Sequence, residues 1–483
     1  PVWTTADVTR NFSLAVFDTL YGFDAQFTLQ PQMVEGHVVS DDGKQWDITL
    51  RDGLRFHDKT PVLARDCVAT IKRWAVRNSL GQALMGRTGE ISAPSDKVIR
   101  VRLKQPFSLV ATALGQVDCA IMPERIAATS PMKQIPEVIG SGPFRFVASE
   151  RIPGARTVFE KNTDYVPRSS GAPSFNAGPK VVYVDRVVWN FIPDPATASA
   201  ALVQGEVDWW ENPTIDLVPQ LRTDKNLVIT VKDRTGEIGC LRFNQLYPPF
   251  DNAAIRRIVL SAFDQKEVME AVAGAVPELI RTGVGLFVPG TPMASTVGVD
   301  VLQGPKDYAK IKQELAAAGY KGEKVVILAA QSYPSIFAEA QVASDVLKKI
   351  GLNTDFQVSD WGTVVQRRAS REPPDKGGWN VFYTLLGGFG NISPAPNLVI
   401  RGNGLGGWFG WPTDAKMEEL RDAWFDAPDV AAQKKICQDM QAEFFQNPSY
   451  VPLGMFDMPT AFRTYLKDIR DGWPQFYGVK KQV

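Results

Sequence analysis

The stretch LRFNQLYPPFDNAAIRRIVLSAFD, residues 241–264, decides the fold. Apolar and polar side chains alternate from Leu241 onward, which predicts a strand that ends at Asn244. The prolines at 248 and 249 stop this strand, because proline cannot donate to a strand ladder. Asp251 then stands where a helix N-cap is expected. The apolar face of that helix would be Ile255, Ile258, Val259 and Ala262.

The composition is that of an ordinary globular protein. The 483 residues are 44% hydrophobic and 22% charged, and the length predicts two or three domains. Lys plus Arg and Asp plus Glu number 53 each, so the net charge is zero. A neutral chain lacks the basic field of nucleic-acid-binding proteins and has no electrostatic reason to bind a membrane surface. No apolar run approaches the roughly 18–20 residues of a membrane-spanning helix.

The Cys and His residues form no catalytic or metal-binding motif. None of the four Cys belongs to a CxxC pair, and the patterns around Cys67 and Cys437 favour free buried thiols over a disulfide. The two His, His37 and His57, belong to no metal cluster, and neither GxSxG nor HExxH occurs. We therefore expect no catalytic residue, no metal and no cofactor.

Residues 33–74 hold turn signals between alternating segments and then a helical pattern. Asp41-Asp-Gly43 predicts a hairpin turn, followed by a strand at 46–51 and a short strand at 54–56. Pro61 suits the first position of a helix that runs to residue 74. The block resembles the signature "LAe.w..s.DG..w.f.LR.gl.FhDG.p..A.DV..t…w" of the dipeptide and oligopeptide (family 5) solute-binding proteins of ABC importers. One departure is Lys59, where that family has Gly.

Further segments resemble the same family in the same order. Residues 140–146 are similar to its "GTGPY.f", residues 161–165 to "r.n..Y", and residues 193–208 to "ipd…a..aL..GevD". The stretch at 241–264 is similar to "FN…PPF…VR.A…A.D", and residues 450–456 to the closing "y.P.g". This collinearity over nearly the whole chain is more specific than any single motif.

Helix and strand patterns alternate in the rest of the chain. A strand at 181–192, a helix at 195–205 and a strand at 206–210 predict a βαβ unit in a mixed sheet. A second βαβ unit is predicted further on. It would comprise strands at 324–328 and 353–358 around a helix at 337–350, with helices at 306–318, 413–423 and 430–445 and a strand at 450–456 beside it.

The resemblance implies an α/β fold with two lobes, the periplasmic-binding-protein fold of type II (cluster C-like), with mixed sheets and an extra α+β domain. Lobe one would contain residues 1–32, 159–246 and 450–483, the extra domain residues 33–158, and lobe two residues 247–449. Two chain crossings, near Asn244 and near Leu453, would form the hinge.

The resemblance also implies a function. The protein would capture a small-molecule or peptide-like ligand between its lobes and deliver it to the ABC permease subunits in the inner membrane. We expect a monomer without nucleic-acid partners, exported to the periplasm, whose signal peptide is absent from this chain. Two other classes stay open: a hydrolase that uses carboxylates in the cleft, and a peptide-binding chaperone.

A long loop region supplies the candidate ligand-binding residues. Residues 371–412 interleave glycines with aromatic side chains, which suits a binding cleft, although these aromatics could also pack on their own lobe. Gly402-Asn-Gly-Leu-Gly-Gly407 within it lacks the spacing of a phosphate-binding loop. Strand ends elsewhere add further candidates. The full set is Trp3, Trp210, Asn244, Trp361, Arg367, Tyr383, Phe389, Asn391, Trp408 and Trp411.

Two positions bear on the chemistry of the ligand. Peptide-binding members of the family use an arginine in the region of Asp360–Arg368 to meet a ligand carboxylate, and Arg367 is the position we carry over, with a solvated helix charge as the alternative. They also use an Asp in the loop that matches residues 386–397 to hold the ligand ammonium. No acid occurs at 387–396, so the ligand is not expected to be an ordinary dipeptide.

Overall fold

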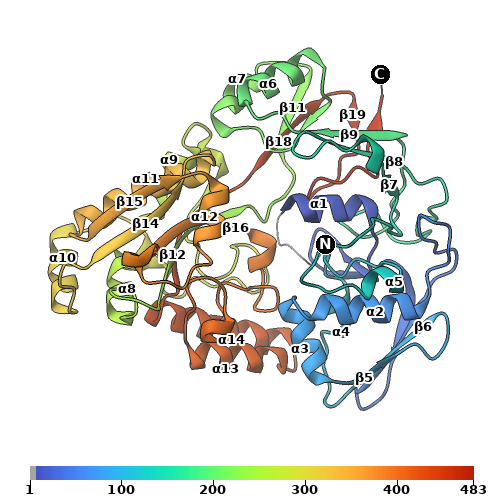
Figure 1. Cartoon of the computed structure of the whole chain (residues 1–483), viewed down its shortest axis with the longest axis horizontal. Helices are drawn as coiled ribbons and strands as arrows, with labels where there is room; N and C mark the ends of the chain where they lie inside the picture. The colour runs from blue at the N-terminus through green and yellow to red at the C-terminus, as the bar shows by residue number, and fades with distance from the viewer. Residues whose placement is uncertain (1–6, 483) are drawn as a thin grey trace. The chain divides into compact units, whose positions relative to one another are not determined.

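The computed structural model describes residues 7–482, and the chain divides into two compact units (Figure 1). The first unit contains the residues up to 214 together with 220–233 and those from 459 onward. The second contains residues 215–219 and 234–458. By this division the chain changes unit at Thr214/Ile215, Pro219/Gln220, Asp233/Arg234 and Met458/Pro459, whereas two crossings were expected, near Asn244 and Leu453. The three-part division into lobes and an extra domain stays a prediction.

The first unit begins with a helix, two short strands and an antiparallel sheet. The sheet has the order β3-β4-β6-β5, and buried and half-buried residues alternate along β4 as predicted for a half-buried strand. The hairpin at 41–43 is confirmed. The elements are α1 (Asp7–Val16), β1 (Tyr21–Phe23), β2 (Leu29–Pro31), β3 (Val34–Val39), β4 (Gln45–Leu50), α2 (Ala64–Ala75), α3 (Ser79–Arg87), β5 (Thr88–Ser92), β6 (Val98–Leu103), α4 (Val110–Leu114) and α5 (Glu124–Ala127).

The predicted start of helix α2 was wrong. The helix begins at Ala64, because the Asp66 carboxylate accepts a hydrogen bond from the Leu63 amide at 2.9 Å and so fixes the N-terminus there. Pro61 instead forms an isolated antiparallel bridge with Arg55. The strand predicted at 54–56 is therefore reduced to this single bridge. Lys59 lies in the turn between Arg55 and Pro61 with φ +70°, a conformation that explains why the family has Gly at this place.

Three smaller sheets complete the first unit. One has the order β7-β8-β9, one β10-β18-β11, and one pairs β19 with β20. The βαβ unit predicted for 181–210 was wrong, because its two strands, β9 and β10, belong to different sheets. The elements are β7 (Phe144–Phe146), β8 (Arg156–Lys161), β9 (Arg186–Asn190), α6 (Pro195–Gln204), β10 (Trp209–Trp210), α7 (Val218–Leu221), β11 (Leu227–Val231), β18 (Pro459–Arg463), β19 (Leu466–Lys467) and β20 (Lys480–Lys481).

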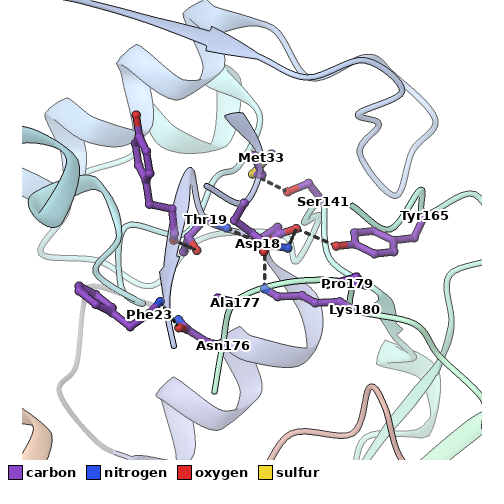
Figure 2. Close-up of polar contacts among 12 residues, drawn as sticks. Asp18, Thr19, Phe23, Met33, Ser141, Tyr165, Asn176, Ala177, Pro179 and Lys180 are labelled. Carbon is purple, nitrogen blue, oxygen red and sulfur yellow. Dashed lines mark hydrogen bonds and ion pairs between the residues drawn. The ribbon is translucent and has the colours of Figure 1, made fainter. Parts of the chain in front are cut away.

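A buried ion pair ties distant segments of the first unit together (Figure 2). Lys180 Nζ lies 2.7 Å from Asp18 Oδ1, and the two side chains are 2% and 0% exposed. Tyr165 donates its hydroxyl to Asp18 Oδ2 at 2.8 Å, and the Thr19 amide donates to Oδ1 at 3.0 Å. Burial acts to lower the pKa of Lys180, but the charge of Asp18, its hydrogen bond and the nearby Tyr477 together raise the pKa above its usual value. Lys180 is therefore charged and paired within its own unit.

The second unit is built on a six-stranded mixed sheet of order β13-β17-β12-β16-β14-β15. β14 runs parallel to β15 and β16, and helix α11 connects β14 to β15, so the second predicted βαβ unit is confirmed. Helix α11 packs on β12, β14, β15 and β16, and α12 packs on β14 (Figure 1). The strands are β12 (Glu237–Phe243), β13 (Ile280–Arg281), β14 (Lys324–Ala330), β15 (Asn353–Ser359), β16 (Val381–Gly387) and β17 (Tyr450–Phe456).

The helices of this unit lie close to their predicted positions. The strand–turn–helix reading of 241–264 is confirmed as β12 and α8, but Asn252 rather than Asp251 caps α8, because the Asn252 Oδ1 accepts from the Ala254 amide at 2.9 Å. No helix among residues 7–482 combines the length and apolar character needed to cross a membrane. The helices are α8 (Ala253–Ser261), α9 (Gln265–Ala273), α10 (Tyr308–Ala317), α11 (Pro334–Lys349), α12 (Trp361–Arg367), α13 (Ala415–Phe425) and α14 (Val430–Gln446).

Candidate functional site

Most of the predicted ligand-binding residues belong to the second unit. Trp3 lies outside the described residues, and Trp210 is a half-buried residue of β10 in the first unit, where it pairs with Ala461. The other predicted residues are on β12, β16, α12 and the loops that follow β16. The candidate ligand-binding surface therefore lies on the second unit.

Arg367 is held by its own unit. Its Nη1 donates to Gln357 Oε1 at 2.9 Å, and its Nη2 donates to the carbonyl oxygen of Gly378 at 3.3 Å. These bonds fix the end of α12 to β15 and to the loop before β16. The Arg367 guanidinium, which the sequence analysis assigned to a ligand carboxylate, is thus bonded within its own unit.

The neighbouring Arg368 lies among aromatic rings and has no acidic partner among residues 7–482. Its guanidinium carbon lies 4.9–5.6 Å from the ring centroids of four aromatic residues. Its Nε is buried without a hydrogen-bond partner, and no ion pair joins it to an acid in the described part of the chain. Burial lowers the pKa of Arg368 to about 10, so it remains charged at neutral pH. The four rings are those of Trp361, Phe382, Trp408 and Phe409.

Another arginine, the fully buried Arg242, also lies near Trp408. The guanidinium carbon of Arg242 lies 5.2 Å from the Trp408 ring centroid, compared with 5.6 Å for Arg368. Arg242 donates to the carbonyl oxygens of Phe409 at 2.7 Å and Val399 at 2.8 Å. Burial lowers its pKa to about 10, and within residues 7–482 it forms no ion pair. Two positive charges near Trp408 are therefore uncompensated by acids.

An aromatic pair extends this surface at the carboxyl ends of the parallel strands. Tyr333 follows β14 and is 41% exposed, and Trp361 follows β15. Their ring centroids are 6.2 Å apart in an edge-to-face arrangement. The Trp361 amide donates to Ser332 Oγ at 2.8 Å, which ties the two strand ends together. Ligands of open α/β sheets bind at this edge, so both rings are well placed to contact one.

Several predicted residues are buried inside the unit instead. Asn244 is 0% exposed, and its amide donates to the Trp379 carbonyl at 2.8 Å and accepts from the Leu246 amide at 3.1 Å. Trp411 is buried beside Trp379, with ring centroids 6.0 Å apart. These contacts give Asn244 and Trp411 structural roles in holding the loops around Trp379.

The Tyr383 side chain lies on one face of the sheet, and Arg368 lies on the other. Successive residues of a strand point to opposite faces, and Phe382 is the residue that contacts Arg368. The Tyr383 hydroxyl therefore lies against α11, 3.2 Å from Ser344 Oγ, and the side chain is fully buried. The Phe389 and Asn391 side chains are also buried, and Asn391 Nδ2 donates to the Gly387 carbonyl at 3.0 Å.

The sequence analysis missed Arg368, Tyr333 and Phe382, although Arg368 had a signal in the sequence. Arg368 is seven residues after Trp361, which places both on one face of a helix. Arg367 is displaced from that face by one position, about 100° of helical rotation. Phe382 could have been preferred to Tyr383 only by knowing which face of β16 meets α12.

His57 and the four cysteines are the other groups that the sequence marked out for their chemistry. His57 Nε2 donates to the Gly142 carbonyl at 3.1 Å, and its Nδ1 accepts from the Gly140 amide at 3.3 Å. Both nitrogens of the neutral ring therefore have a hydrogen-bond partner. Burial lowers its pKa to about 4. The four cysteines are free and buried, and no group of three or more potential metal ligands occurs among residues 7–482.

Comparisons with known proteins show the family. The model of the bacterial extracellular solute-binding proteins, family 5 (middle part), matches residues 28–403. The probable peptide ABC transporter periplasmic-binding protein y4tO of Sinorhizobium fredii is 37% identical over 464 residues, which cover 96% of this chain and 87% of the relative. The oligopeptide-binding protein AppA of Bacillus subtilis is 24% identical over 413 residues, which cover 80% of this chain and 70% of the relative.

Solved structures show the same fold. The binding protein AgaA from A. tumefaciens R10, in complex with agropinic acid, matches with a TM-score of 0.81 at 19% identity and covers 100% of this chain and 96% of its own. The DppA protein of Helicobacter pylori, in complex with the peptide STSA, matches with a TM-score of 0.83 at 19% identity, covering 100% and 95%. The predicted periplasmic-binding-protein fold is confirmed.

Proposed function

The chain belongs to the bacterial extracellular solute-binding proteins of family 5, and we propose that its ligand is a small organic anion held by Arg368. The protein is thus the solute-binding component of an ABC importer, a family whose members bind peptides or other small ligands. The single observation that carries the proposal is the Arg368 guanidinium, which is enclosed by aromatic rings and has no acidic partner.

The energetics of burial favour an anionic ligand. A partly buried charge without a partner is costly, whereas a ligand carboxylate would supply the missing partner and form charge-assisted hydrogen bonds worth roughly 1.5–3 kcal/mol. Arg242 adds a second positive charge near Trp408. The loop at 387–396 has no acid that could hold a ligand ammonium. The surface is therefore biased toward a negative rather than a zwitterionic ligand.

The aromatic rings favour a ligand with a planar or apolar portion. Trp361 lies beside Arg368, Tyr333 packs against Trp361, and both offer rings with few rotatable bonds. A solved relative of the same fold holds an acid, agropinic acid, which supports the proposal for this chain. A dipeptide with a free ammonium would lack a partner for its positive charge here.

Further properties belong to the same proposal. The protein acts as a monomer in the periplasm, hands its ligand to permease subunits of the inner membrane, and leaves the ligand chemically unchanged. The neutral, fully hydrogen-bonded His57 and the absence of a GxSxG or HExxH motif support a binding role. The family membership supports the location and the permease partner.

Calorimetric titration with matched pairs of acids and their amides tests the proposal. An aromatic or opine-like carboxylic acid should bind, and its primary amide should bind about 10–100-fold more weakly, because the amide lacks the charge that Arg368 requires. Arg368→Gln should remove this preference, whereas Arg257→Gln, which alters an exposed arginine bonded to the Gln446 carbonyl, should retain it.

Equal binding of acid and amide to the unaltered protein would contradict the proposed ligand class. Recovery of the ligand after incubation, followed by mass spectrometry, separates binding from catalysis. Conversion of the ligand by the protein would favour the hydrolase alternative.

A further inference from the structure

Two crossings, residues 232–236 and residues 457–458, join antiparallel strand pairs of the two units and are unequal in length. In the first unit β11 pairs with β18 up to Val231 and Pro459, and in the second unit β12 pairs with β17 from Glu237 and Phe456. Residues 232–236 of one crossing therefore oppose only residues 457–458 of the other. A ladder cannot continue across five residues that face two, so neither crossing is stiffened by regular pairing.

Arg281 joins both crossings on the side of the second unit. It belongs to the short strand β13, which pairs with Met455 and Phe456 of β17. Its Nη2 forms an ion pair with the Asp457 carboxylate and donates to the carbonyl oxygen of Arg234 at 2.9 Å. The Asp457 amide donates to the carbonyl of Leu279, just before β13, at 2.9 Å. One guanidinium thus connects the shorter crossing to the longer one.

Gly236 makes room for this contact. It has φ +60°, and a Cβ atom at this position would lie 2.6–2.8 Å from Met455 Cε, Arg281 Nη2 and Asp457 Oδ1. A side chain here would therefore both strain the backbone and displace the arginine. The backbone of the longer crossing is shaped to lie against Arg281.

The longer crossing is also bonded to the turn that follows β16. The Gly388 amide donates to the Gly236 carbonyl at 2.8 Å. A Cβ atom on Gly388 would lie 1.9 Å from the Thr235 carbonyl oxygen, so only glycine allows this approach. Gly388 opens the turn Gly388–Asn391, which contains Phe389 and Asn391. A movement of this turn must therefore act on the crossing at Thr235 and Gly236.

We propose that Arg281 is a positioning residue that couples the Gly388–Asn391 turn to both crossings and thereby sets how far the two units move relative to each other. Arg281 would act without touching the ligand. This inference goes beyond the proposed ligand class, because it holds for an anionic or a neutral ligand alike. Its test can therefore be carried out on the ligand-free protein.

Spin-label distance measurements provide the first readout. Labels attached at Val203→Cys in the first unit and Val430→Cys in the second, both exposed positions, report the distribution of distances between the units, and the buried native cysteines should stay unlabelled. Arg281→Met should broaden or shift this distribution, whereas Arg257→Met, which removes a single bond to the Gln446 carbonyl, should leave it unchanged.

Hydrogen exchange of the Gly388 amide provides a local second readout. Its exchange should accelerate about tenfold in Arg281→Met, equivalent to about 1.4 kcal/mol, because the acceptor Gly236 is no longer held. Arg281→Lys can pair with Asp457 but has no fork to reach Arg234 as well, so an intermediate effect is expected. If the methionine variant does not fold, the lysine variant carries the test. A distance distribution and a Gly388 exchange rate equal to those of Arg257→Met would overturn the proposal.

Discussion

Lys180 in the first unit and Arg368 in the second are both cations removed from bulk water, but their surroundings differ. Lys180 is fully buried and paired with Asp18, which also accepts hydrogen bonds from Tyr165 and Thr19 (Figure 2). Arg368 lies among four aromatic rings and has no acid beside it in residues 7–482. A buried charge that already has its partner is costly to separate from it, whereas a charge without a partner is available to a ligand.

The largest expected effect comes from removing the partner of Lys180. Asp18→Asn should destabilise the protein by about 3–5 kcal/mol, because it leaves a buried charge without compensation. Urea unfolding followed by tryptophan fluorescence measures the change. Asp18→Asn combined with Lys180→Met should recover part of the loss, since no unpaired charge remains. A loss below about 1 kcal/mol for the single variant would show that the pair is not a structural element.

A second test uses His57, a buried group that the fold keeps neutral. Its pKa is lowered to about 4, mainly by burial. His57 therefore takes up a proton near pH 6.5 in the unfolded chain but only near pH 4 in the folded protein. Stability from this group is therefore complete above pH 6.5 and is lost as the pH falls toward 4, by about 3 kcal/mol.

The variant His57→Gln isolates this contribution. Between pH 7 and pH 4 the free energy of unfolding should fall for both proteins. The fall should be about 3 kcal/mol smaller for His57→Gln than for the unaltered protein. His37→Gln serves as the control, since the His37 ring bonds only to the Tyr21 hydroxyl, at 2.9 Å, and is less enclosed. Parallel pH profiles of the unaltered protein and His57→Gln would refute the assignment.

The third test inverts the first. Arg368→Met should change the free energy of unfolding by less than about 1 kcal/mol or raise it, because no partner is left unpaired and the aromatic cage accepts an apolar side chain. The affinity for a carboxylate ligand should nevertheless fall by about 10–100-fold. Thermal unfolding and calorimetric titration of the same preparation measure both. A large loss of stability would mean that Arg368 is a structural cation like Lys180.

The smallest expected effect concerns Glu339 of α11, a buried acid in the second unit. Burial raises its pKa well above the usual range, although the backbone of Cys240 favours the ionised form. The Glu339 carboxyl therefore stays protonated in the folded protein at pH values at which it is ionised in the unfolded chain. The stability that this group contributes is lost as the pH rises above the pKa of a free carboxyl group. Glu339→Gln should be more stable than the unaltered protein at pH 8 but not at pH 4, whereas exposed Glu314→Gln should match it at both.

The elements of the fold were largely predictable because local patterns agree with the final packing. The stretch at 241–264 became β12 and α8, and the strands at 324–328 and 353–358 became a parallel pair. The failures came where a contact far along the chain decides the outcome. The strand at 186–190 pairs with β8 rather than with β10, and only the tertiary arrangement of strands settles this.

The candidate site was predictable in region but not in residues. The region of α12 and the aromatic loop was identified, yet Arg367 and Tyr383 were chosen where Arg368 and Phe382 face each other. In both cases the error is one position along the chain. The face of a helix or strand that meets a neighbouring element depends on packing, which a single sequence does not specify.

A crystal structure of the protein with a bound carboxylic acid tests the anion site most directly. The predicted result places a ligand carboxylate oxygen within about 2.7–2.9 Å of a terminal nitrogen of Arg368, with Tyr333 or Trp361 against the rest of the ligand. A ligand carboxylate bound at Arg367 instead, or an Arg368 guanidinium paired with an acid of its own chain, would contradict the assignment.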